Sequence, residues 1–190
     1  MSMQIHVRGP QPGDLCVLLE PAEADLPALR QSQFYLQAVF GGRLAKEIHL
    51  TCQRFESPDP QMSSDVVQHI QTFCTTLKPI PIVGVSLMQW KPRYSLVHML
   101  RWQIRLTDEL RDFCAQLEEV LKAAGAKPLY IPGRFPTLIT ALEEIPNAPM
   151  DPNRLADSDF PHQLFLGQRV VLSKIMAADV YETLHTFCIE

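Results

Sequence analysis

The sequence predicts an α+β protein built from two lobes, because one order of elements occurs twice along its 190 residues. A strand, a helix and a second strand are expected over residues 15–55, and again over residues 95–142. Duplication of one β-α-β unit would place the second strands of the two halves opposite each other across a pseudo-twofold axis. Chance repetition of such a common motif is the alternative. The length suits a single two-lobed domain over residues 1–190.

The first half contains a strand, a helix and a longer strand. The apolar run at 15–19 is typical of a short buried strand, and apolar residues at helical spacing predict a helix that ends at Gly41-Gly42. Residues 45–55 are then predicted to form a strand. Its alternation sends two sets of side chains to opposite faces, namely Ile48, Leu50 and Cys52 to one and His49, Thr51 and Gln53 to the other.

The remaining elements follow from periodicity and from turn residues. Helices are expected after Ser63 or Ser64 and after Thr107, where a side-chain oxygen can cap the first turn. The segment 177–187 is either a short helix or a turn followed by an edge strand. Strands are predicted at 82–90, 95–105, 133–142 and 164–175, and a long surface loop at 143–161.

Composition limits the classes of function. The formal net charge is −4, whereas a protein that holds a long duplex usually presents a basic surface. No apolar run is long enough to span a bilayer and no signal peptide is apparent, so a cytoplasmic location is expected. The five cysteines are scattered and form no CxxC pair. They indicate neither a disulfide framework nor a zinc site, and most are expected to be buried thiols.

The densest chemical signal is the segment around His49-Leu50-Thr51. On a strand, the side chains of His49 and Thr51 project from the same face about 7 Å apart. An imidazole exchanges a proton near neutral pH, and a hydroxyl group beside it can bind a phosphate oxygen. A half-exposed strand with polar residues on its solvent side is the alternative for this short pattern.

The order of motifs resembles that of the two-histidine phosphoesterases, the group that contains bacterial 2′-5′ RNA ligase. The resemblance covers nearly the whole chain: the H-x-T strand, a central hairpin near 82–102 and the leucine-rich helix at 108–124. It continues through a strand that begins Arg134-Phe135-Pro136. The resemblance ends with a last strand that contains Val170-Val171-Leu172-Ser173 and a closing segment, Tyr181-Glu182-Thr183-Leu184. It implies two lobes with mainly antiparallel sheets around a central cleft.

The resemblance also implies a metal-free reaction without a cofactor. In that family each half supplies one H-x-T/S motif, and the two histidines act as general base and general acid. Together they open a 2′,3′-cyclic phosphate at an RNA end or in a small nucleotide. His49 would be the acid–base residue of this chain and Thr51 a phosphate ligand.

The second motif lacks its histidine. Aligning Pro136 with the family's proline puts Thr137, 88 residues after His49, in the place of the second histidine. A shift of one residue would place Leu138 and Thr140 there instead, which still provides no base. Arg54 and Arg134 could contact phosphate or ribose, or could be solvated surface residues.

Other residues are weaker candidates. His162 precedes the last predicted strand and leaves too little chain to finish the second lobe, while His98 is expected to be structural. Trp90 and Trp102 could stack a base, but tryptophans in such a hairpin more often pack it together. Two functions therefore stay open: a phosphoesterase acting on 2′,3′-cyclic phosphate ends, and a catalytically silent protein that binds a nucleotide or a phosphorylated ligand.

Overall fold

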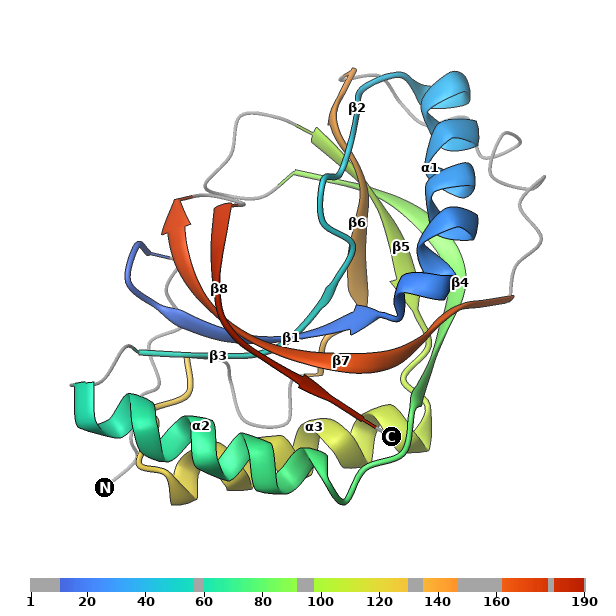
Figure 1. Ribbon diagram of the computed structural model, residues 1–190. Helices are drawn as coiled ribbons and strands as arrows, with labels where there is room; N and C mark the ends of the chain where they lie inside the picture. Colours follow the sequence, from blue (N-terminus) through green and yellow to red (C-terminus); the bar gives the residue numbers. More distant parts are fainter. Residues whose placement is uncertain are drawn as a thin grey trace, which may run out of the picture.

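The computed structural model describes residues 11–56, 60–91, 98–129, 135–146, 162–177 and 180–189 (Figure 1). The first half contains β1 (Leu15–Pro21), the 3₁₀ turn η1 (Glu23–Asp25), α1 (Leu26–Phe40), β2 (Arg43–Leu44) and β3 (Leu50–Phe55). The middle contains α2 (Pro60–Cys74), β4 (Ile80–Trp90), β5 (His98–Ile104) and α3 (Asp108–Ala123). The chain continues through β6 (Leu138–Ile145), β7 (His162–Ala177) and β8 (Val180–Cys188).

The strands form one eight-stranded sheet in the order β2-β6-β5-β4-β7-β1-β3, and β8 pairs with β7. Each of these strand pairs is antiparallel, as the resemblance implies. The two β-α-β units, β1-α1-β3 and β5-α3-β6, thus share a single sheet. Although β3 and β6 stand near opposite ends of the strand order, they contact each other, so the sheet curves until its two halves meet.

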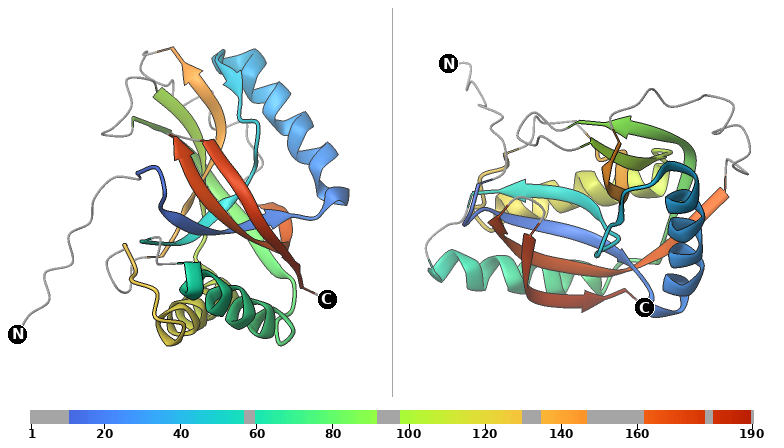
Figure 2. Two further views of the ribbon diagram at one scale, coloured as in Figure 1. Left: turned by 60° about the vertical axis from the view of Figure 1, so that its left-hand side comes forward. Right: turned by 90° about the horizontal axis from the view of Figure 1, so that it is seen from above.

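Helices α2 and α3 lie side by side against one face of the sheet, and α1 packs next to β2 and β6 (Figures 1 and 2). The main core fills the space between helices and sheet, and its largest fully buried side chains include Trp102, Phe55 and Phe113. Stacked rings of Phe73 and Phe113, 5.7 Å apart, join α2 to α3. This layer of apolar packing fixes the positions of β3 and β6, which carry the candidate site.

Several predicted ends and elements are confirmed. Gly41 ends α1 with a φ of +72°, a left-handed value that glycine adopts without strain. Thr107 caps α3, since its hydroxyl accepts a hydrogen bond of 3.2 Å from the amide of Leu110. Of the two readings for the C-terminal segment, the strand is correct, because β8 pairs with β7 along its length.

Two predicted strands have different bounds. The strand expected at 45–55 begins only at Leu50, because the chain between β2 and β3 crosses from β6 to β1 and cannot stay paired with either. The strand expected at 133–142 begins at Leu138 and continues to Ile145, so residues 143–145 are strand instead of loop. The predicted turn at 91–93 and the loop beyond residue 146 lie largely outside the described residues.

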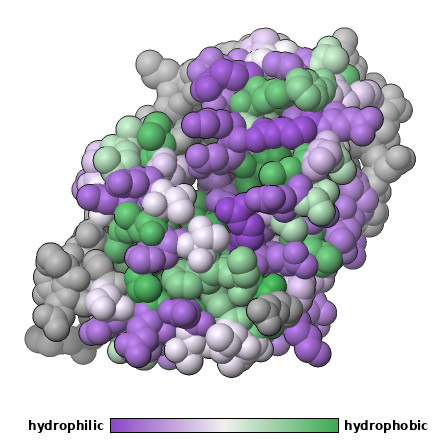
Figure 3. Space-filling model, in the orientation of Figure 1, coloured by the Kyte–Doolittle hydropathy of each residue, from purple (hydrophilic) through white to green (hydrophobic). Residues whose placement is uncertain are grey.

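The face of the molecule seen in Figure 3 is mixed in polarity. In the view of Figure 3, hydrophilic side chains interrupted by small apolar patches cover the part of the molecule where α1 and β2 lie. Within the described ranges, no helix is long and apolar enough to cross a membrane.

Candidate functional site

His49 lies immediately before β3, on the face of the sheet opposite the main core. Its neighbours Ile48 and Leu50 are both buried in that core, so the imidazole between them points the other way. The ring of Tyr181 from β8 meets the imidazole edge to face, with centroids 5.1 Å apart. Tyr181 also packs on a small second core, formed by Cys16, Leu18, Val171 and Ile175, on this same face. We call this side of the sheet, which also carries Thr51, the site face.

The environment of His49 keeps its imidazole neutral. Burial, followed by the positive charge of Arg101, lowers the pKa of His49 to about 4. The residue is half-buried overall, but its Nδ1 atom is buried and has no hydrogen-bond partner among the described residues. A buried polar atom without a partner is costly, and such atoms often mark a place where a ligand or water binds. His49 is therefore a neutral imidazole with a nitrogen that is available for a hydrogen bond to a ligand.

A β-bulge interrupts the first half of the sheet next to His49. Val17 of β1 pairs with Gln53 of β3. The next residue, Leu18, pairs with Thr51, so Cys52 lies between the two pairs as an extra residue. The bulge reverses the alternation beyond it. Gln53 was expected on the same face as His49 and Thr51, but it is paired with a core residue and is buried.

The second half of the sheet has a bulge in the corresponding place. Leu100 of β5 pairs with Leu142 of β6. The next residue, Arg101, pairs with Thr140, so Ala141 is the extra residue. Because Leu100 and Leu142 belong to the main core, Arg101 and Thr140 face away from it.

Superposing the two bulges sets the second motif in register with the first. Thr51 then corresponds to Thr140, and His49 corresponds to Leu138. This is the alternative register considered from the sequence, and the pairing supports it over the one that starts at Thr137. Thr137 itself is exposed and directly precedes β6, and its carbonyl accepts a hydrogen bond of 2.7 Å from Ile104. A role for Thr137 in substrate binding stays a prediction.

Arg101 contributes a positive charge to this site. Its guanidinium carbon lies 3.8 Å from the centroid of the Trp90 ring, and its Nη2 donates a hydrogen bond of 3.5 Å to the sulfur of Met99. Its charge acts on the imidazole of His49, which shows that the two halves of the site lie within electrostatic reach. The sequence reasoning did not single out Arg101. The alternation of Arg101 and Gln103 with the core residue Trp102 predicts only that Arg101 lies on the outer face of its strand.

Arg54 also lies on the site face. It pairs with Cys16 across β1 and β3 and is only 8% exposed, so it is not a solvated surface residue. Its role as a phosphate or ribose ligand stays a prediction. The same prediction for Arg134 falls outside the described residues.

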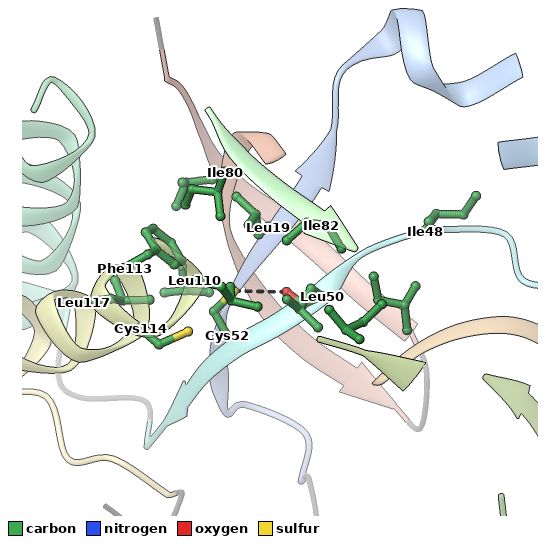
Figure 4. Close-up of a cluster of buried hydrophobic side chains, with 14 of the residues drawn as sticks. Leu19, Ile48, Leu50, Cys52, Ile80, Ile82, Leu110, Phe113, Cys114 and Leu117 are labelled. Atoms are coloured by element: carbon green, nitrogen blue, oxygen red, sulfur yellow. Dashed lines mark hydrogen bonds between the residues drawn. The ribbon is translucent and has the colours of Figure 1, made fainter. Parts of the chain in front are cut away.

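The buried thiols are structural, as the sequence predicts. Cys52 and Cys114 face each other between β3 and α3 (Figure 4). Burial and the neighbouring Cys114 thiol raise the pKa of Cys52 well above its usual range, and burial raises the pKa of Cys16 to about 12. Both thiols therefore stay protonated and are poor nucleophiles. In the described part of the chain, no group of three or more His, Cys, Asp or Glu residues is placed to hold a metal ion.

The other candidate residues differ in burial and in their contacts. Trp102 is 2% exposed in the main core, whereas Trp90 is half-buried beneath Arg101. His98 begins β5, and its Nδ1 lies 3.2 Å from the side-chain nitrogen of Gln89. His162 begins β7, where it is exposed and pairs with Gly84 of β4.

Comparison with solved structures shows that this fold is similar to that of a phosphoesterase, of LigT and of a PDE domain. Apo LigT from E. coli matches with a TM-score of 0.59 and 14% identity, over 94% of this chain and 98% of that chain. TT0787 of Thermus thermophilus matches with a TM-score of 0.58 and 18% identity, over 93% and 97% of the two chains. The MHV ns2 PDE domain matches with a TM-score of 0.54 and 12% identity, over 92% and 100%.

At these identities the likeness establishes the fold and leaves the activity to be argued from the site. No family model matches the sequence, and no curated protein matches it. E. coli LigT itself has been solved in complex with 3′-AMP, with NADP⁺ and with ATP.

The lowered pKa of His49 predicts an unusual titration. We expect its imidazole to take up a proton only near pH 4, while an ordinary histidine does so near pH 6.5. Two-dimensional NMR of the ring would measure this, with His49→Gln identifying the resonance. A midpoint close to 6.5 would contradict the buried environment described above. Between pH 6.5 and 4 the unfolded chain binds more protons at this residue, so the unfolding free energy of the wild type should fall relative to His49→Gln as the pH is lowered.

Proposed function

We propose that the protein binds a nucleotide or another phosphorylated ligand in this site and lacks the two-histidine reaction. The observation that carries the proposal is the register of the two bulges. It makes Leu138 the counterpart of His49 and Thr140 the counterpart of Thr51, so both hydroxyl groups are kept. Leucine can neither donate nor accept a proton, so one of the two acid–base groups is missing.

The remaining groups suit a phosphate. Arg101 provides a positive charge held by Trp90, and two threonine hydroxyls can donate hydrogen bonds to phosphate oxygens. The neutral imidazole of His49 can donate one more. LigT, which shares the fold, has been solved with 3′-AMP, and this supports a nucleotide as the first ligand to test.

Binding should be coupled to proton uptake. An anionic phosphate beside His49 favours the charged imidazole, so it would raise the pKa of His49 above about 4. Between pH 4 and that raised value, the complex holds more protons than the free protein. The affinity should therefore increase as the pH falls through this window.

Hydrolysis of 2′,3′-cyclic phosphate ends is the second candidate, and the observation that favours it is the neutral imidazole of His49 beside Thr51. A neutral imidazole can accept a proton from water. Its low pKa makes it a weak base, however, and the loss of one acid–base partner commonly costs about 10²–10⁴ in rate. We therefore rank binding above turnover.

Calorimetry with 3′-AMP and a hydrolysis assay with 2′,3′-cyclic AMP test the proposal together. We expect micromolar binding of 3′-AMP and roughly tenfold weaker binding by Thr140→Val, because one hydrogen bond to a charged group is lost. Thr72→Val, which removes an exposed hydroxyl on α2, is the matched control and should bind as the wild type does. Absence of binding, or equal affinity in Thr140→Val, would refute the proposal. Turnover that disappears in His49→Ala would instead establish the second candidate.

A further inference from the structure

One polar side chain in the core connects the two halves of the site. Gln33 lies in the middle of α1 and is fully buried, where an apolar residue would be the usual choice. Its side-chain nitrogen donates hydrogen bonds to the carbonyls of Ala141, at 2.8 Å, and Ala45, at 3.2 Å. Its side-chain oxygen accepts one of 2.7 Å from Nη1 of Arg30. A buried amide is costly unless it is hydrogen-bonded, and both the nitrogen and the oxygen of this one are hydrogen-bonded.

Both carbonyls belong to segments that carry the site. Ala141 is the bulge residue that directly follows Thr140 on β6. Ala45 lies between β2 and β3, four residues before His49, and its amide also bonds to the carbonyl of Ala141. Gln33 therefore joins the segment that precedes His49 to the bulge that follows Thr140.

Arg30 extends this connection. Its Nη1 donates a hydrogen bond of 2.6 Å to the carbonyl of Ala45, and its Nη2 donates to the carbonyl of Lys46. Residues 45–49, which cross between the two ends of the sheet, belong to no strand, although the amide of Ala45 still bonds to Ala141 of β6. The side chains of Arg30 and Gln33 supply the hydrogen bonds that a neighbouring strand would otherwise provide.

The second helix has an equivalent position. Leu29, Gln33 and Leu36 of α1 have the same spacing as Leu110, Cys114 and Leu117 of α3, and all six are buried. Gln33 then corresponds to Cys114. Cys114 faces Cys52, the bulge residue of β3, as Gln33 faces Ala141, the bulge residue of β6 (Figure 4). Each helix therefore contacts, from the same position, the bulge beside the site threonine of the other half.

We infer that Gln33 is a positioning residue, which sets the placement of the Thr140 half of the site relative to the His49 half. Arg30 assists it by fixing residues 45 and 46. Gln33 touches no ligand in this role, and the inference rests on the proposed function only where ligand affinity is the readout. Apolar packing alone would hold α1 in place without determining where these two carbonyls lie.

The test compares Gln33→Met with Leu36→Ala. Gln33→Met keeps the length of the side chain and removes its hydrogen bonds, whereas Leu36→Ala destabilises the same helix without touching the network. We expect Gln33→Met to weaken 3′-AMP binding at least tenfold. We also expect it to raise the pKa of His49, because Arg101 would move away from the imidazole whose pKa it lowers. Leu36→Ala should leave the affinity within twofold and the titration unchanged, although it unfolds more easily.

Two further outcomes decide the inference. Wild-type affinity and an unchanged His49 titration in Gln33→Met would overturn it, and so would equal losses in the two variants. If Gln33→Met does not fold, Arg30→Met takes its place, with the same directions expected and the same result overturning the inference. If the wild type does not bind 3′-AMP, the proposed function fails, while the His49 titration still tests the positioning role by itself.

Discussion

Replacing Leu138 with histidine should give the protein hydrolytic activity toward 2′,3′-cyclic AMP, with a rate roughly 10²–10⁴ above that of the wild type. The matching bulges make position 138 the counterpart of His49 in the second half, so we expect the new imidazole to supply the missing acid–base partner. The hydroxyls of Thr51 and Thr140 and the charge of Arg101 are already present to stabilise charge on the phosphate. A coupled assay of the 2′- or 3′-AMP released would measure the gain.

Thr137→His is the matched control for this gain. It adds the same side chain one residue earlier, at an exposed position that the bulge register does not match with His49. The two variants thus separate the register drawn from the bulges from the one drawn from the 88-residue spacing. Activity in Thr137→His and none in Leu138→His would reverse the assignment.

The pH profile of Leu138→His gives a second measurement. Base action by His49 requires the neutral imidazole, which is present above about pH 4. Acid action by the new histidine requires the protonated form, which the nearby Arg101 charge disfavours. Activity should therefore peak on the acid side of neutrality. Adding His49→Ala to Leu138→His should abolish it.

The fold could be predicted from the sequence where the hydrophobic pattern is strong. α1 and α3 have clear helical stripes and recognisable ends at Gly41 and Thr107. β8 could not be separated from a helix, because most of its residues are exposed and it shows little alternation. The element order and the family-level fold needed only these patterns and their sequence of occurrence.

The register of the site could not be predicted, because a bulge adds one residue without leaving a distinctive sequence. In β6, Ile139, Ala141 and Leu142 all belong to the main core, whereas consecutive residues of a regular strand point to opposite faces. Aligning Pro136 with the family's proline, without knowledge of the bulge, pointed instead to Thr137. Only the pairing of β6 with β5 identifies Thr140 as the counterpart of Thr51.

Arg101 was missed for a related reason. A single arginine in an apolar strand is usually a solvated residue on the outer face of a sheet. Its importance here comes from the curvature that brings β3 into contact with β6, and contacts so distant in sequence leave no local pattern. The stacking on Trp90 likewise depends on the pairing of β4 with β5.

Replacing Arg101 with glutamine should have the largest effect on binding. Removing one partner of a hydrogen-bonded charge pair costs about 2–5 kcal/mol, so we expect at least about 30-fold weaker binding of 3′-AMP. Arg101→Lys keeps the charge but loses the planar group that stacks on Trp90 and binds phosphate in a bidentate manner. Its affinity should fall between those of the wild type and Arg101→Gln. Arg111→Gln, on the exposed side of α3, makes the same change in net charge and should bind as the wild type does.

The same variant has a readout that needs no ligand. The charge of Arg101 is the second cause of the low pKa of His49, after burial. Arg101→Gln should therefore raise that pKa only part of the way toward 6.5, while Arg101→Lys leaves it low. If the His49 titration is the same in Arg101→Gln as in the wild type, the two side chains do not share a site. In that case the phosphate-binding arrangement proposed here is wrong, whatever the affinity for 3′-AMP. If the titration moves and the affinity does not, the two halves meet as described and the ligand is of another kind.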